Sequence, residues 1–196
     1  MQKNCMTTSN KPTVIGLAGT FASGKDTLAH YLLEKCGYSH FSTGDMVRKE
    51  ALKQYGSAER PVCQRIAREL REKDGAGIFV QKALRAYDEQ KLKGGIVVTG
   101  LRTTGEAKEI QKTRGVVVFV DAPVEIRYER MKSRQRDDEV QLTLEGFKEL
   151  EAKEWYAGNK DTDFNFSALK QMANIVLEND ANLESFIEHA NKEIFS

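Results

Sequence analysis

Cysteine and proline are scarce in this sequence, and neither sign of charge is in excess. Its three cysteines, Cys5, Cys36 and Cys63, are an odd number without Cys-x-x-Cys spacing, which argues against a disulfide framework and against a zinc site. Thirty basic residues stand against 29 acidic ones, for a net charge of +1. The chain as a whole therefore has no strong attraction for nucleic acid or acidic membranes. We expect a reducing, cytoplasmic environment.

Long hydrophobic runs are also missing. No stretch of about 18 apolar residues is present, and the first residues lack the apolar centre of a secretion signal. We expect residues 1–12 to be a short disordered leader. The remaining residues, 13–196, are enough for one domain with a substantial core.

What the sequence does contain is an alternation of short apolar runs with helical patterns. The apolar runs have the length of buried parallel strands and cover residues 14–18, 39–42, 96–99, 116–120 and 175–177. Segments with helical spacing separate them. This order predicts an α/β fold of three layers, in which helices cover both faces of a parallel five-stranded sheet.

Two segments interrupt the alternation. Residues 43–93 contain about three helical stretches without a strand, with breaks near Gly56 and residues 75–77, and we interpret them as a helical insert. Residues 134–166 are polar and charged, with a helix expected at about 143–156, and we interpret them as a lid. Trp155 and Tyr156 end that helix, and we expect both to pack in the core rather than stack on a base.

The strongest chemical motif follows the first apolar run. Residues 19–27 read Gly-Thr-Phe-Ala-Ser-Gly-Lys-Asp-Thr, between an expected strand and an expected helix. Glycines let successive N–H groups converge on an anion, the helix adds its positive end, and the lysine supplies a mobile cation. The motif predicts a P-loop NTPase fold that binds ATP through Gly19, Ala22, Ser23, Gly24, Lys25, Asp26 and Thr27.

Asp26 stands where this motif normally has a serine or threonine that touches magnesium. A hydroxyl follows one place later, at Thr27. Because magnesium prefers hard oxygen ligands, a carboxylate is able to hold the ion directly or through its water. We therefore expect Mg²⁺ with ATP, and Asp26 is the candidate metal ligand.

A second motif, Ser-Thr-Gly-Asp-Met-Val-Arg, covers residues 42–48 at the end of the second expected strand. Thr43 is a candidate helix N-cap, and Arg48 lies one turn beyond Gly44, so helix N–H groups and a guanidinium are able to face one anion. A capped helix with a surface arginine explains the same residues equally well. Farther along, Thr103 and Glu106 have the spacing of a capping box.

Arginines are densest after the fourth apolar run, at Arg127, Arg130, Arg134 and Arg136. The first three share a helical face. A solvated helix is the simplest explanation, but arginines that close over a phosphoryl group in transit stabilise its negative charge. The three histidines, His30, His40 and His189, lack partners at metal-ligand spacing, and we interpret them as structural or surface residues.

Residues 19–27 and 42–48 together resemble the adenylate-kinase-like nucleoside monophosphate kinases. The resemblance implies that Thr43, Gly44 and Arg48 line an acceptor site. Residues 95–102 resemble the third strand of that family, which implies a further acceptor contact by Arg102. Thr99 stands where the family has an aspartate, so the carboxylate near the metal is expected to have moved to Asp26.

The lid entry and the end of the chain extend the resemblance. Residues 130–138 are similar to the lid entry of the same kinases, which implies contacts to donor phosphates by Arg130, Arg134 and Arg136, with Arg127 a weaker candidate. Residues 173–184 resemble the tail of dephospho-coenzyme A kinases and of archaeal relatives of the nucleotide kinases.

The expected activity is transfer of the γ-phosphoryl group of ATP to a small nucleotide, with a nucleoside monophosphate as the preferred acceptor. Lys25, Arg130, Arg134 and Arg136 are the candidate catalytic residues. A dephospho-coenzyme A kinase-like enzyme is the alternative within this class. A regulatory ATPase that controls a partner is the alternative from another class, and an RNA-associated ATPase has only the local arginines in its favour.

Overall fold

The computed structural model describes residues 11–134 and 142–196. These residues form a five-stranded sheet in which every pairing is parallel, in the order β2-β3-β1-β4-β5. The strands are β1 (Val14–Gly19), β2 (Ser39–Ser42), β3 (Ile96–Leu101), β4 (Val116–Asp121) and β5 (Ile175–Glu178). All five expected strands and the expected parallel sheet are confirmed.

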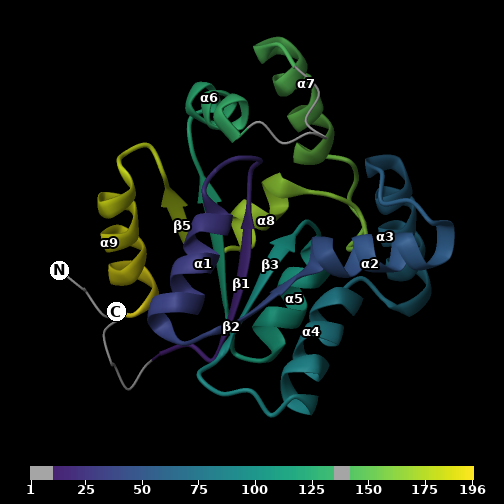
Figure 1. Ribbon diagram of the computed structural model, residues 1–196, viewed down its shortest axis with the longest axis horizontal. Coiled ribbons are helices and arrows are strands. Elements are labelled where there is room, and N and C mark those ends of the chain that lie inside the picture. Colours follow the sequence, from purple (N-terminus) through teal and green to yellow (C-terminus); the bar gives the residue numbers. More distant parts are fainter. Residues whose placement is uncertain (1–10, 135–141) are drawn as a thin grey trace.

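The strand order places β1 at the centre of the sheet. From β1 the chain runs to β2 and β3 on one side of it and then crosses to β4 and β5 on the other, which makes the carboxyl end of β1 the place where ligands bind in open α/β sheets. Figure 1 shows α6 (Val124–Arg134) and α7 (Leu144–Trp155) beyond this edge of the sheet. The fold therefore positions a candidate site where residues 19–27 begin.

Helices cover both faces of the sheet, so the predicted three-layer arrangement is confirmed (Figure 1). On one face, α1 (Lys25–Cys36) and α9 (Leu183–Ile194) pack on a cluster that includes the fully buried Ile15 and Leu17. On the other face, α4 (Ile78–Glu89), α5 (Thr104–Lys112) and α8 (Phe166–Met172) pack on the cluster around Val98 and Phe119. Burial on both faces explains why the central strands are continuously apolar.

The predicted helical insert consists of α2 (Thr43–Tyr55), α3 (Arg60–Asp74) and α4. Gly56 and Gly75 end α2 and α3 with positive φ angles of 66° and 104°, a conformation that glycine adopts at little cost. Val47, Ile66 and Phe79, one from each helix, bury a small core of their own. This separate core lets the insert present a wall beside the sheet.

In the expected lid region, the helix is observed as α7, with Thr143 as its N-cap. Trp155 packs against the sheet cluster as expected. Tyr156 does not, since 56% of it is exposed. The prediction for Tyr156 was wrong because α7 ends at Trp155 and the extended backbone turns the next side chain toward solvent.

Within the described ranges, no helix combines the length and apolarity that crossing a membrane requires.

Candidate active site

The loop between β1 and α1 has the backbone of an anion-binding turn. Ala22 has a φ of 61°, and Gly24, the N-cap of α1, has a φ of 99° with no side-chain cap. The first N–H groups of α1 are thus left for a ligand. A Cβ atom on Gly19 would lie 2.2 Å from the Val120 carbonyl oxygen, so a side chain there would disrupt the close approach of β1 and β4.

A cavity of about 330 Å³ opens at this turn. We call it the P-loop cavity, and its lining includes five of the seven residues predicted to bind ATP: Ala22, Gly24, Lys25, Asp26 and Thr27. Gly19 and Ser23 are not among the residues that line it, and the buried Ser23 hydroxyl lacks a hydrogen-bond partner among the described residues. Lys25 Nζ lies 3.7 Å from Asp26 Oδ1. A cation and a carboxylate oxygen thus face the same space, which suits a phosphate with its magnesium ion.

Arg130 reaches the P-loop cavity through Asn179, a residue that sequence reasoning missed. The Arg130 Nη2 atom donates to Asn179 Oδ1 at 3.2 Å, and Asn179 Nδ2 donates to the Ser23 carbonyl at 2.7 Å. Asn179 follows β5 and lies 156 residues from Ser23 in sequence. Its only sequence signal was its place just after the last strand, whose carboxyl end meets the same sheet edge.

Arg127 has a structural role instead. It is buried, donates from Nε to the Ala122 carbonyl at 2.6 Å, and pairs with Glu151 of α7. Its Nη1 atom also approaches the Phe21 carbonyl at 3.4 Å. Arg134 is the last residue of α6, and Arg136 lies outside the described residues. Their predicted contacts with phosphate remain predictions.

Asp121, at the end of β4, links the P-loop to α8. Its carboxylate accepts from Thr20 Oγ1 at 2.9 Å and from Lys170 Nζ at 2.7 Å. Burial alone would raise the pKa of Asp121, but these two hydrogen bonds and one from the Ala122 N–H outweigh it, so the pKa lies below the ordinary value of 3.8. For Lys170, burial opposes the charged form, but Asp121 and Glu178 hold the pKa above 10.5.

The lowered pKa of Asp121 predicts a pH-dependent contribution to stability. A depressed carboxyl pKa stabilises the fold above the unfolded-state value, and this contribution is lost as pH falls through the folded-state value. We expect Asp121→Asn to lower the unfolding free energy at pH 7 and to differ less from wild type as pH drops below about 4. Urea titrations at several pH values measure this. A gap between the two proteins that stays constant down to pH 3 would contradict the assignment.

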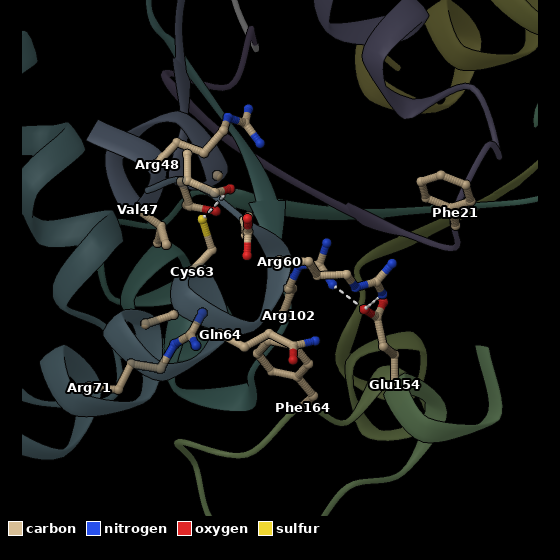
Figure 2. A pocket seen from close by; sticks show the side chains of 15 residues that line it. Phe21, Val47, Arg48, Arg60, Cys63, Gln64, Arg71, Arg102, Glu154 and Phe164 are labelled. Atoms are coloured by element: carbon tan, nitrogen blue, oxygen red, sulfur yellow. Dashed lines mark hydrogen bonds and ion pairs between the residues drawn. The ribbon is translucent and has the colours of Figure 1, made fainter. Parts of the chain in front are cut away.

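A second cavity, of about 440 Å³, lies between the insert, α7 and the end of β3. Four arginines from three segments, α2, α3 and the end of β3, line it, and we call it the arginine pocket: Arg48, Arg60, Arg71 and Arg102. Figure 2 shows how their side chains surround the space together with Phe164 and Glu154. All four predicted acceptor residues, Thr43, Gly44, Arg48 and Arg102, line this pocket.

At the start of α2, the prediction of Thr43 as the N-cap was wrong by one residue. Ser42, not Thr43, is the N-cap, because its Oγ accepts from the Asp45 N–H at 3.1 Å. Thr43 Oγ1 instead donates to the Gly100 carbonyl at 2.9 Å, which ties α2 to β3. The Arg48 guanidinium lies beside Gly44, pairs with Asp45 and remains more than half exposed. It is therefore accessible to a ligand in the pocket.

The predicted capping box explains how Arg102 is positioned. Thr103 and Glu106 cap α5 reciprocally, and Glu106 Oε2 also accepts from the Arg102 N–H at 2.8 Å. Its other oxygen, Oε1, accepts from Arg71 Nη2 at 2.8 Å, and both side chains are buried. One carboxylate thus joins α3, α5 and the end of β3, and it holds the wall of the arginine pocket in place.

Arg60 and Glu154 are pocket residues that sequence reasoning missed. Glu154 Oε1 lies 2.7 Å from Arg60 Nη2 and 2.8 Å from Arg102 Nη1. Arg60 is 94 residues from Glu154 in sequence, and no local pattern predicts such a pair. The presence of a glutamate among polar helix residues was the only available signal, and it is not specific.

All three histidines fit the expected structural or surface roles. His30 and His189 are exposed and pair with glutamates one turn away. His40 Nε2 lies 2.9 Å from the hydroxyl of Thr99, at the position where the resembling kinases have an aspartate. Burial lowers the pKa of His40, although Asp45 and Asp26 oppose this. The His40 imidazole and the Thr99 hydroxyl thus link the neighbouring strands β2 and β3.

Curated relatives of this chain share most of its length. A UPF0200/UPF0201 protein of Archaeoglobus fulgidus is 32% identical over 89% of this chain, but the match covers 53% of that relative, so the chain spans about half of its length. A UPF0200 protein of Sulfurisphaera tokodaii is 28% identical, over 88% of this chain and 90% of the relative. One of Methanosarcina mazei is 26% identical, over 88% and 89%.

Solved structures with the same fold cover nearly the whole chain. TT1252 from Thermus thermophilus superposes with a TM-score of 0.60 at 20% identity and covers 95% of this chain and 97% of its own. Shikimate kinase from Bacteroides thetaiotaomicron superposes with a TM-score of 0.58 at 12% identity and covers 94% and 99%. At these identities, the likeness describes the fold alone.

A family model agrees with the P-loop geometry. The model of an AAA domain matches residues 15–154, which include the P-loop, the insert and almost all of β1 and α7. The match covers well over half of the 196 residues. The chain therefore belongs to the AAA domain family, and its fold is of the P-loop kinase type.

Proposed function

We propose that this protein is an ATP- and Mg²⁺-dependent kinase that transfers the γ-phosphoryl group to a nucleotide, with a nucleoside monophosphate as the preferred acceptor. One observation carries the proposal: a P-loop cavity and an arginine pocket lie at the same carboxyl edge of one sheet. A kinase needs two anion sites side by side, because donor and acceptor must be held in line for transfer. A reducing cytosol suits such an enzyme.

In this proposal, the P-loop cavity holds ATP. The N–H groups at the start of α1 and the Lys25 ammonium contact the phosphates. Asp26 is 59% exposed and lines the cavity beside Thr27, so both offer oxygen atoms suited to Mg²⁺. A bound Mg²⁺ ion would neutralise charge on the phosphate oxygens.

The arginine pocket holds the acceptor. Arg48 and Arg102 are each more than one-third exposed within it, and guanidinium groups bind phosphate through two parallel hydrogen bonds. Phe164, Val47 and the aliphatic part of Gln64 line the rest of the pocket and offer a surface for a base or another flat group. We propose that residues 43–93 form the acceptor insert and residues 134–166 the lid.

Transfer itself requires charge compensation rather than a protein nucleophile. We propose that Arg130, anchored through Asn179 at the P-loop, stabilises charge as the phosphoryl group moves. Arg134 and Arg136 are proposed to join it on lid closure, which also excludes water that would otherwise accept the phosphoryl group.

Two other functions use the same sites. A dephospho-coenzyme A kinase-like activity is favoured by the residues 173–184, which place Asn179 at the P-loop. A regulatory ATPase would use the P-loop cavity without an acceptor. Assaying ATP turnover with four nucleoside monophosphates, dephospho-coenzyme A and no acceptor separates the three. Turnover that is equally fast without acceptor would contradict a kinase.

Arg48→Ala tests the acceptor assignment. We expect it to raise the acceptor KM by about 10- to 100-fold, the loss of one or two charge-assisted hydrogen bonds, and to leave the KM for ATP nearly unchanged. Arg68→Ala is the matched control, since Arg68 is an exposed arginine of α3 in the same insert. Equal effects of Arg48→Ala on both KM values would remove Arg48 from the acceptor site.

A further inference from the structure

Glu154 of α7 is a carboxylate inside a pocket that otherwise suits anions. Its side chain is 11% exposed, and its Oε1 atom contacts both Arg60 of α3 and Arg102 after β3 (Figure 2). A carboxylate so nearly buried is unfavourable unless cations surround it. Three segments far apart in sequence therefore converge on a single anion position, and an atom of the protein occupies it.

We propose that Glu154 is an internal substitute for the anionic group of the acceptor. Without acceptor it occupies the position between Arg60 and Arg102, and a phosphate group of the acceptor takes its place on binding. The inference rests on the proposed function, since it concerns the same pocket, and it adds Arg60 to the acceptor-binding residues. It also defines the acceptor class as a molecule with a terminal phosphate.

The contact geometry favours displacement. Arg60 donates a hydrogen bond to Glu154 Oε1, and Arg102 forms an ion pair with the same oxygen, so both guanidinium groups share one oxygen of Glu154. A phosphate has three terminal oxygens and up to two negative charges, and it is able to pair with both arginines through separate oxygens. Side chains of Arg60 and Arg102 are 51% and 38% exposed, so an incoming anion reaches them more readily than it reaches Glu154.

Displacement of Glu154 would alter the contacts that α7 makes with the P-loop. One turn earlier on α7, Glu151 pairs with Arg127, whose Nη1 atom approaches the Phe21 carbonyl of the P-loop at 3.4 Å. Glu151 thus connects α7 to the P-loop side, and Glu154 connects it to the arginine pocket. Release of Glu154 frees the acceptor-side contact, so acceptor binding is linked to the position of the lid helix over ATP.

Trp155 reports on this step directly. It is the single tryptophan of the sequence and directly follows Glu154. We would fill the P-loop cavity with Mg²⁺ and a non-hydrolysable ATP analogue, then titrate inorganic phosphate and four nucleoside monophosphates. Trp155 emission and calorimetry would be recorded for wild type, Glu154→Gln and the control Glu149→Gln, an exposed glutamate of the same helix.

We expect phosphate compounds to change Trp155 emission in wild type. Glu154→Gln removes the competing charge and keeps the side-chain size, so these compounds should bind about 5- to 10-fold more tightly, as expected when a charge-assisted hydrogen bond becomes a neutral one. Its emission before titration should resemble that of liganded wild type. Glu149→Gln should behave as wild type.

Three results would overturn the inference: equal or weaker binding by Glu154→Gln, Trp155 emission that stays constant as wild type saturates, or no binding of any phosphate compound. The outcome is separable from that of the proposed function. Tighter phosphate binding by Glu154→Gln with no phosphorylation of any nucleotide would sustain Glu154's role and refute the nucleotide acceptor. Normal nucleotide phosphorylation by wild type, without tighter phosphate binding by Glu154→Gln, would support the nucleotide acceptor and refute the role of Glu154.

Discussion

Replacing Lys25 by alanine should reduce phosphoryl transfer by about 10³-fold or more, because it removes the ammonium group that, in the proposed function, contacts the outer phosphates of ATP. Lys25 is the first residue of α1 and lines the P-loop cavity beside Asp26 and Thr27. Its charge would act on the transferred group at the moment when negative charge moves between donor and acceptor. Steady-state turnover with saturating acceptor measures the loss.

The substitution should leave the fold intact. Lys25 lies in the first turn of its helix and belongs to none of the apolar clusters that the described residues form, so we expect the thermal midpoint to change little. Lys35→Ala is the control, since Lys35 is exposed in the last turn of the same helix and far from the P-loop. Near-normal activity of Lys25→Ala would refute the assignment of the P-loop cavity to ATP.

Arg71→Met should produce the largest loss of stability. Arg71 and Glu106 are 3% and 0% exposed, and their side chains are joined at 2.8 Å and 3.2 Å. Removing one partner of a buried ion pair leaves the other charge buried and uncompensated, at a cost of about 3–5 kcal/mol. For a chain of this size, that corresponds to a fall in the thermal midpoint of roughly 10 °C.

Arg71→Met should also disturb the arginine pocket. Glu106 also accepts from the Arg102 N–H, so a disturbed Glu106 displaces Arg102, and the acceptor KM should rise even where Arg71→Met remains folded. Arg71→Lys keeps the charge and should lie between wild type and Arg71→Met. Arg68→Met, on the exposed face of the same helix, should be neutral. A midpoint of Arg71→Met equal to that of wild type would show that the pair contributes nothing.

Local chemistry explains which parts of the site could be predicted. The P-loop is read from adjacent residues, because its glycines and lysine act through one short turn. The capping box of Thr103 and Glu106 is equally local, and it is present. The N-cap of α2 was misplaced by one residue, since Ser42 and Thr43 have the same hydroxyl chemistry and only the distance to Asp45 decides between them.

The partners of those residues could not be predicted. Asn179 reaches Ser23 across 156 residues, and Arg60 reaches Glu154 across 94. Such pairs depend on which helices pack against the same sheet edge and on how each is rotated. Charged residues occur at many positions in this sequence, and their pattern does not distinguish a solvated glutamate from one held between two arginines.

The sequence by itself determined the order of strands and helices, the P-loop and the two interruptions that became the insert and α7, since each depends on apolar periodicity or on neighbouring residues. Tertiary structure alone decided that Arg48, Arg60, Arg71 and Arg102 share one pocket and that Glu154 lies within it. The physical reason is the distance in sequence over which each effect acts. Backbone preferences depend on residues a few positions apart, whereas charged residues pair wherever the packing of the core brings them close in space.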